Sequence, residues 1–203
     1  MAANAPRRTG TRAAQTAARK ARLIDAAVSL AAEGGYDAVQ MRDVAARADV
    51  ALGTLYRHYS SKDQLLLAAL REQAAALCDG LERRPAAGGT PAERVADVLR
   101  RASRSLERNP RVTGALVTAM FVNDNGAREH KQAVRESMHL MLERAIDGAQ
   151  IDDLDGVLDV LGHTWIATLA FWASGMGDGQ AMGDRLERAA HLLLDAPPRT
   201  APG

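Results

Sequence analysis

Residues 39–59 read VQMRDVAARADVALGTLYRHY, and this stretch decides the fold. The spacing of its apolar residues predicts two short helices joined by a tight turn at Asp49. The apolar faces consist of Val44, Ala45 and Ala48 on the first helix, and of Val50, Leu52 and Leu55 on the second. The second helix and the residues after it are rich in hydrogen-bond donors and aromatic rings, from Thr54 to Tyr59. Such a pair is either a helix-turn-helix suited to the major groove of DNA or an ordinary αα-hairpin in a helical core.

The charge distribution around this stretch favours the DNA-binding interpretation. Residues 1–24 carry six Lys or Arg residues and no acid. Residues 1–62 carry a net charge of +5, whereas the whole chain of 203 residues carries only +1. A basic N-terminal third on a mildly acidic body points to a polyanionic partner for that third.

Composition predicts a helical protein and excludes several other classes. Alanine is abundant and aromatic residues make up 3% of the chain, which favours helices over sheets. The single cysteine, Cys78, excludes an internal disulfide and an all-cysteine metal site. No stretch approaches the roughly 18–20 uninterrupted apolar residues of a membrane helix, and no apolar segment follows the basic N-terminus as in a secretory signal. We therefore expect a cytoplasmic protein that makes no membrane contact.

The N-terminal half of the chain predicts an arm, a helical head and a connecting helix. Residues 1–15 lack an apolar period and are expected to be disordered. The first helix should cover about 17–33, with Gly34 in the left-handed conformation of a C-terminal cap. Ser61 and Gln64 form the pattern of a capping box that opens the next helix, which should run to about Arg83.

The C-terminal half predicts five more helices. Thr90-Pro91 and Asn109-Pro110 each place a capping residue before a proline at the first helical position, which opens helices over about 91–107 and 110–121. Apolar periodicity predicts further helices over about 127–147, 152–175 and 180–195. The expected fold is all-α with about nine helices. Its parts are a disordered basic arm (1–15), a helix-turn-helix domain (16–62), an effector-binding and dimerisation domain (63–196) and a tail (197–203).

The run from Gly35 to Leu65 resembles the N-terminal signature of the TetR family of bacterial transcriptional regulators. The resemblance rests on the motifs Val44-Ala45, Ala48-Asp49-Val50 and Gly53-Thr54-Leu55-Tyr56, followed by Lys62 and Leu65. The chain is most similar to the KstR-type branch, which regulates sterol and lipid catabolism, through Gly34-Gly35-Tyr36, Asn109-Pro110 and Trp165. It departs from the family pattern at Tyr59, where Phe is frequent, and at Gln40, where Thr is frequent.

This resemblance implies a homodimeric repressor that binds double-stranded DNA at an inverted-repeat operator and is released by a small apolar effector. The effector that the resemblance suggests is a steroid or fatty acyl-CoA thioester. An activator, a constitutive DNA-binding regulator without an effector, and a multidrug-responsive repressor remain alternatives.

The second helix, the helix starts and the basic arm supply the expected DNA contacts. Gly53 either allows a close approach to the DNA backbone or packs tightly between the two helices. The arm could reach the minor groove or the flanking phosphates. The candidate DNA-binding residues are Gln40, Met41, Arg42, Leu52, Gly53, Thr54, Tyr56, Arg57, His58, Tyr59, Lys62, Arg12, Arg19 and Lys20.

The body should contain both an effector pocket and a dimer interface. Flexible methionines and bulky apolar side chains suit the wall of an adaptable pocket. The candidate pocket residues are Leu99, Leu106, Leu116, Met120, Phe121, Met138, Met141, Leu142, Trp165, Leu169 and Trp172. The candidate dimer residues are Leu158, Leu161, Leu186, Ala190 and Leu193.

An enzyme is the competing class, but the sequence offers it little support. The five histidines show no metal-ligand spacing, and no glycine-rich loop could cradle a phosphate. We therefore expect no catalytic residues, no metal and no cofactor.

Overall fold

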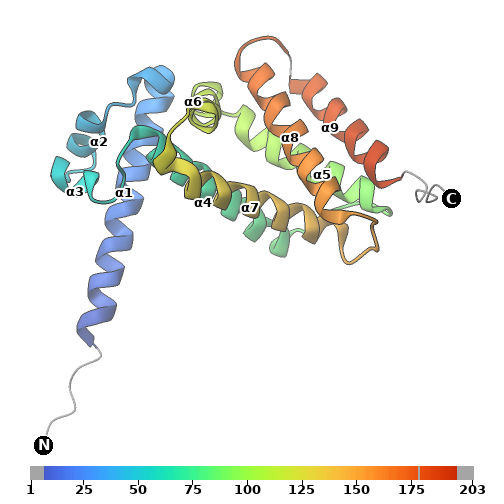
Figure 1. Ribbon diagram of the computed structural model, residues 1–203, viewed down its shortest axis with the longest axis horizontal. Coiled ribbons are helices and arrows are strands. Elements are labelled where there is room, and N and C mark those ends of the chain that lie inside the picture. The colour runs from blue at the N-terminus through green and yellow to red at the C-terminus, as the bar shows by residue number, and fades with distance from the viewer. Residues whose placement is uncertain (1–6, 178, 196–203) are drawn as a thin grey trace, which may run out of the picture.

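The computed structural model of the protein is described over residues 7–177 and 179–195. Within these residues it consists of nine α-helices and one short 3-10 helix, which confirms the all-α prediction (Figure 1). The helices are α1 (Arg7–Ala38), α2 (Met41–Arg47), α3 (Leu52–Tyr56), α4 (Lys62–Arg83), α5 (Pro91–Glu107), α6 (Pro110–Phe121), α7 (Arg128–Ile146), α8 (Leu154–Ala173) and α9 (Gly179–Leu194), with the 3-10 helix η1 (Asn125–Ala127) before α7.

Helix α1 is much longer than the sequence analysis expected. It begins at Arg7, so residues 7–15 are helical, whereas disorder was expected over 1–15. Residues 1–6 and the expected tail at 197–203 lie outside the described part of the chain. Alanine and arginine are strong helix formers, and their abundance in this segment accounts for the helical backbone without an apolar period. Figure 1 shows the N-terminal end of α1 projecting away from the rest of the molecule.

A kink at Gly34-Gly35 ends the main part of α1. Gly35 has φ +71° and ψ −158°, a region that only glycine adopts readily, whereas Gly34 has φ −144°. The positive φ that was assigned to the first glycine is therefore found at the second, and its ψ differs from that of the left-handed cap. The kink lets the last turn of α1, ending at Ala38, redirect the chain into α2.

The turn between α2 and α3 is closed by backbone hydrogen bonds around Asp49. The Asp49 N–H donates to the Ala46 carbonyl, and the Val50 N–H donates to the Ala45 carbonyl. These two bonds and the φ of +51° at Asp49 define a Schellman motif with aspartate in the position usually held by glycine. The motif stops α2 and sets the start of α3.

Side-chain caps open the longer helices much as the sequence predicts. The capping box at Thr90 and Glu93 is formed in full, and Asn109 caps α6. Ser61 caps α4 by accepting a hydrogen bond from the Gln64 N–H at 3.2 Å. The Gln64 side chain, however, accepts from the Ser60 N–H rather than from Ser61, so this second half of the predicted box is shifted by one residue.

Two hydrophobic cores hold the molecule together, and α6 links them. One core combines α1, α2 and α3 with the first turns of α4 and with Val112, Ala115, Leu116 and Ala119 of α6. The second core joins the rest of α4 to α5, α7, α8 and α9. Met120 at the end of α6 packs against both cores. The three-helix head is thus packed directly on a helix of the body.

Among the described helices, α8 is long enough and apolar enough to cross a membrane. Length and composition are a weak indication by themselves, because core helices of soluble proteins meet the same criteria. One face of α8, with Leu158, Leu161 and Trp165, is buried in the second core.

Replacing Gly35 with alanine should destabilise the protein. A Cβ at Gly35 meets no other atom, so the cost is the conformational strain at φ +71°, about 1–3 kcal/mol. Gly80 is the matched control: it lies inside α4 and its added Cβ would also meet nothing. We expect Gly80→Ala to stabilise the helix by up to about 1 kcal/mol. Thermal and urea unfolding of the two variants should therefore shift in opposite directions, and equal shifts would contradict the assigned backbone conformation.

Candidate nucleic-acid interface and ligand pocket

Helix α3 presents an open face around Gly53. Gly53 is exposed, and a Cβ built on it would have no neighbour within 4 Å. The alternative that Gly53 packs tightly between α2 and α3 is therefore wrong. What remains is a helix surface without a side chain, onto which another backbone can be brought close.

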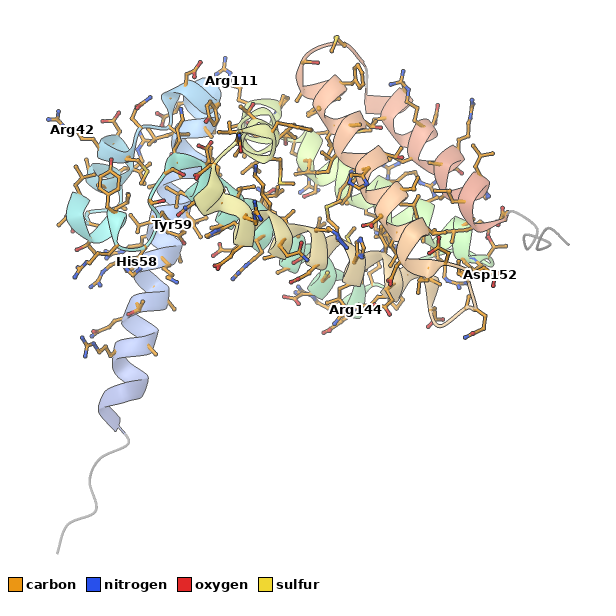
Figure 2. All side chains as sticks on the ribbon, in the orientation of Figure 1. Arg42, His58, Tyr59, Arg111, Arg144 and Asp152 are labelled. Atoms are coloured by element: carbon orange, nitrogen blue, oxygen red, sulfur yellow. The ribbon has the colours of Figure 1, made fainter. Side chains whose placement is uncertain are left out.

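Polar side chains border this bare position. The Arg57 guanidinium donates from Nη2 to Thr54 Oγ1 at 2.8 Å, which fixes both side chains on the same side of α3. The Tyr56 ring is 51% exposed. Arg42 extends from the start of α2, away from the body (Figure 2). Together these groups offer hydrogen-bond donors and positive charge on one face of the head.

Tyr59 does not belong to this face, in contrast to the sequence prediction. It is only 5% exposed, and its ring lies 6.4 Å from the ring of His130 on α7. Burial raises the pKa of its hydroxyl. The two tyrosines are only three residues apart but differ in environment. Tyr56 faces outward, whereas Tyr59 packs at the junction of head and body.

Four other predicted DNA-binding residues differ in how freely their side chains could contact DNA. Leu52 is exposed and does not belong to the buried face of the second helix. Met41 is partly buried against the core of the head. The Gln40 amide donates to the Asp37 carbonyl. Lys62 is partly buried and donates from Nζ to the Tyr36 carbonyl at 3.2 Å. Its ammonium group lies 3.8 Å from the centre of the Tyr36 ring, so it is held against Tyr36 rather than extended toward a phosphate.

The basic residues of α1 lie beside the end of α3. The pKa of His58 is lowered first by burial and then by the charges of Lys20, Arg19 and Arg57. Arg12 and Lys20 are exposed, and Arg19 is partly exposed. Arg19 and Lys20 of α1 therefore lie close enough to the end of α3 for their charges to act on His58 together with that of Arg57.

A second candidate site lies in the body, between α6, α7 and α8. It is a partly open pocket of about 430 Å³, which we call the basic pocket. Apolar and charged side chains share its wall. Its lining residues are Met120, Phe121, Asn123, Asp124, Arg128, Lys131, Gln132, Arg135, Met138, His139, Asp159, Gly162, His163 and Ile166.

The charges of the basic pocket follow one face of α7. Arg128, Lys131 and Arg135 recur at helical spacing and all line the pocket. Across the pocket, Asp159 of α8 pairs with Arg135 at 3.3 Å and with His139 at 2.9 Å. Arg128 has no ion-pair partner among the described residues. Lys131 donates from Nζ to the Val122 carbonyl at 2.6 Å. The pocket therefore combines an apolar wall with three cationic groups, of which Arg128 is the one without a partner among the described residues.

Most of the predicted pocket residues are core residues instead. Met120, Phe121 and Met138 line the basic pocket. The others are buried in the two cores or, for Trp172, packed partly buried against the second core: Leu99, Leu106, Leu116, Met141, Leu142, Trp165, Leu169 and Trp172. The reason is geometric, because the most apolar stripe of each helix turns toward its neighbours and the pocket forms along the more polar edge.

The predicted dimer residues are also largely buried within the single chain. Leu158, Leu161, Leu186 and Ala190 are each at most 2% exposed and belong to the second core, and Leu193 is partly buried against it. The exposed side of α8 carries a different set. It consists of Val160, His163, Ala167 and Phe171.

The basic pocket is connected to the head by a short chain of hydrogen bonds. Ser61, the cap of α4, donates from Oγ to the carboxylate of the pocket residue Asp124 at 2.6 Å. This bond, followed by one from the Gly126 N–H, lowers the pKa of Asp124. On the other side of α6, the Arg111 side chain donates to the Glu33 carbonyl in α1 at 2.9 Å. A change in the pocket can therefore reach the head through two contacts at opposite ends of α6.

Sequence reasoning missed the cationic lining of the pocket, although its signal was present. The spacing of Arg128, Lys131 and Arg135 places them on one helix face, but only the packing of α7 against α8 turns that face into a pocket wall. No group of three metal-binding side chains was found among the described residues.

Comparisons with known proteins agree with this architecture. Residues 23–69 match the model of the bacterial regulatory proteins of the tetR family, and residues 88–193 match that of the tetracyclin repressor-like C-terminal domain. The chain is 36% identical over 177 residues to the HTH-type transcriptional repressor KstR of Mycolicibacterium smegmatis, covering 87% of both chains. The KstR of Rhodococcus jostii is also 36% identical, with 87% of this chain and 82% of the relative covered.

Solved structures give the same result. A TetR transcriptional regulator from Rhodococcus sp. RHA1 superposes with a TM-score of 0.81 at 29% identity, covering 89% of this chain and 97% of that one. Thermus thermophilus FadR, a TetR-family repressor solved in complex with lauroyl-CoA, shares the fold with a TM-score of 0.71 at 22% identity and coverages of 91% and 99%. The head with its open α3 face, the helical body and these matches over nearly the whole chain show that the protein belongs to the TetR family of bacterial regulatory proteins.

Proposed function

We propose that this protein is a cytoplasmic transcriptional repressor that binds an inverted-repeat operator as a homodimer and is released by an acyl-CoA thioester. The observation that carries the DNA-binding part is the open face of α3, where Gly53 has no neighbour and Thr54 and Arg57 are held together. The relatives named KstR are transcriptional repressors, which supports repression over activation.

In this proposal α3 enters the major groove and the flanking groups contact phosphates. Thr54, Tyr56 and Arg57 supply the polar contacts beside the bare position at Gly53. Arg42 is exposed at the start of α2, Arg19 and Lys20 lie near His58, and all three neutralise phosphate charge. Binding should therefore weaken steeply as salt rises.

The homodimer is proposed to form through the exposed side of α8. Val160 and Phe171 are large apolar side chains that are 48% and 50% exposed, and they lie on the face opposite the second core. A two-fold interface pairs the same surface of both chains, and that symmetry presents two heads to two half-sites.

Gly53→Ala tests the DNA-binding role. The added methyl group meets no protein atom and favours the helix, so the unfolding temperature should not fall. Operator affinity should drop about tenfold or more, equivalent to about 1.4 kcal/mol, because the methyl group separates α3 from the DNA. The measurement is a titration of the duplex selected from a random pool, with two chains expected per duplex. Gly80→Ala should bind like the parent, and equally tight binding by Gly53→Ala would contradict the proposed face.

The basic pocket supports a thioester effector with an anionic end. Met120, Phe121 and Met138 suit an acyl or steroid group, whereas Arg128 suits a phosphate of coenzyme A. Lys131 adds positive charge to the same wall, although its ammonium group donates to the Val122 carbonyl. The relative from T. thermophilus was solved with lauroyl-CoA, and it shares the fold of this chain. A purely apolar drug would offer no anionic group to Arg128, so the thioester is favoured over a multidrug effector.

Arg128→Ala tests this effector. Arg128 lines the pocket without an ion-pair partner among the residues described, so its loss should remove a charged contact without disturbing the protein. We expect lauroyl-CoA to bind about tenfold more weakly, measured by calorimetry, because a hydrogen bond to a charged group contributes about 1.5–3 kcal/mol. Arg144→Ala, on the same helix but outside the basic pocket, is the matched control. Equal affinities of the two variants would count against the proposed phosphate site.

The coupling between effector and DNA is proposed to pass through Asp124. This residue lines the pocket and also holds Ser61, the first capping residue of α4, directly after the head. A ligand that displaces the Asn123–Asp124 segment would pull on the start of α4 and change the orientation of the head. An effector that prefers the displaced form shifts the population away from DNA binding.

Asp124→Ala should weaken this coupling while leaving both binding sites in place. The expected result is that lauroyl-CoA still binds, the operator still binds, and the ratio of operator affinities without and with lauroyl-CoA falls toward one. Asn123→Ala is the control, because Asn123 lines the same pocket but makes no hydrogen bond to the head in the described structure. If Asp124→Ala kept the full ratio, the route through Ser61 would be excluded. If no acyl-CoA changes the operator affinity of the parent protein, the result would instead favour the interpretation that the protein is a constitutive regulator.

A further inference from the structure

The N-terminal extension of α1 is a helix that the fold of the head does not use. Among residues 12–22 no side chain is buried, and only Thr16 and Arg19 are even partly covered, whereas Leu23 is fully buried. Residues 7–22 therefore form about four turns of helix beyond the core, a length of about 24 Å. In Figure 1 this part of α1 projects beyond α3 and the rest of the head.

Three arginines of this extension lie along one side of the helix, whereas Lys20 lies off that side. At about 100° per residue, Arg12, Gln15, Arg19 and Arg22 fall on a common stripe. No acid occurs before Asp25, and none of these arginines forms an ion pair within the described parts of the chain. The stripe is therefore a row of uncompensated positive charge.

The stripe begins near the end of α3. His58, two residues after α3, lies beside α1 (Figure 2), and the nearby charges of Lys20 and Arg19 lower its pKa after the larger effect of burial. Arg12 continues the stripe from Arg19 two turns farther from the core, in the direction away from the head. The positive surface that begins at α3 thus extends along α1 past the end of the head.

We propose that this extension binds the sugar-phosphate backbone of duplex DNA outside the half-site that α3 reads. The inference rests on the proposed DNA-binding function and adds a second contact region to it. An α-helix is about 10–12 Å across with its side chains, whereas the minor groove is about 6 Å wide, so the extension lies against phosphates rather than in that groove. Its length matches about seven base pairs of duplex at 3.4 Å each.

Such a contact is independent of sequence and adds to affinity and to footprint length. Phosphate neutralisation releases counterions, so each contact should steepen the salt dependence by about 0.9 in the log–log slope. DNA contact would also stabilise a helix that is short and unpacked, and such helices are marginally stable in water by themselves.

The experiment compares two duplexes that share the selected palindrome. One ends at the edges of the palindrome, and the other carries eight extra base pairs of arbitrary sequence on each side. We expect the full chain to bind the longer duplex about tenfold more tightly at low salt, with a steeper salt slope and a footprint that reaches into the added flanks. The variant with Arg12→Ala and Arg22→Ala should bind both duplexes with the affinity that the parent shows for the short one.

The matched control carries Arg83→Ala and Arg84→Ala, which remove the same charge from the exposed far end of α4. It should retain the preference for the longer duplex. A parent protein that binds both duplexes equally, or an Arg12/Arg22 variant that keeps the preference, would overturn the proposal. Failure of the parent to bind either duplex would instead refute the proposed operator function, so the two failures are distinguishable.

Discussion

Helix α6 packs its Val112, Ala115, Leu116 and Ala119 side into the core of the head, and its C-terminal end, with Met120 and Phe121, lines the basic pocket. Buried leucine and valine side chains contribute about 1.5–3 kcal/mol each, so the head cannot separate from α6 without losing a large part of its core. Head and pocket are therefore parts of one packed unit, so a rearrangement of α6 would change the packing of both.

Two hydrogen bonds link α6 and the segment after it to the helices on either side of the helix-turn-helix. Arg111 at the start of α6 holds the carbonyl of Glu33, just before the kink at Gly35. Asp124, just after α6, holds the cap of α4. The two contacts connect α6 to the two helices that enter and leave the helix-turn-helix. Because hydrogen bonds depend steeply on distance and angle, small shifts of α6 change the support of the head on both sides.

Much of the fold could be predicted from local patterns. The caps at Thr90 and Asn109, the apolar spacing of each helix and the turn at Asp49 depend on neighbouring residues only, and the structure has helices where they predict them. The expectation of disorder before residue 16 failed because helix formation there needs only favourable backbone propensity, not an apolar face. The prediction for Gly34 failed because either of two adjacent glycines can take a positive φ, and the direction of the chain into α2 decides between them.

The sequence by itself determined the helix-turn-helix, the all-helical body and the basic character of the N-terminal third, because these depend on composition and on spacing along one helix. Only the tertiary structure decided which tyrosine faces outward, that Gly53 lies free, and that the pocket follows the cationic edge of α7. The physical reason is that each amphipathic helix has an apolar stripe and two edges. The stripe is visible in the sequence, whereas the partner that covers each edge depends on how the helices pack.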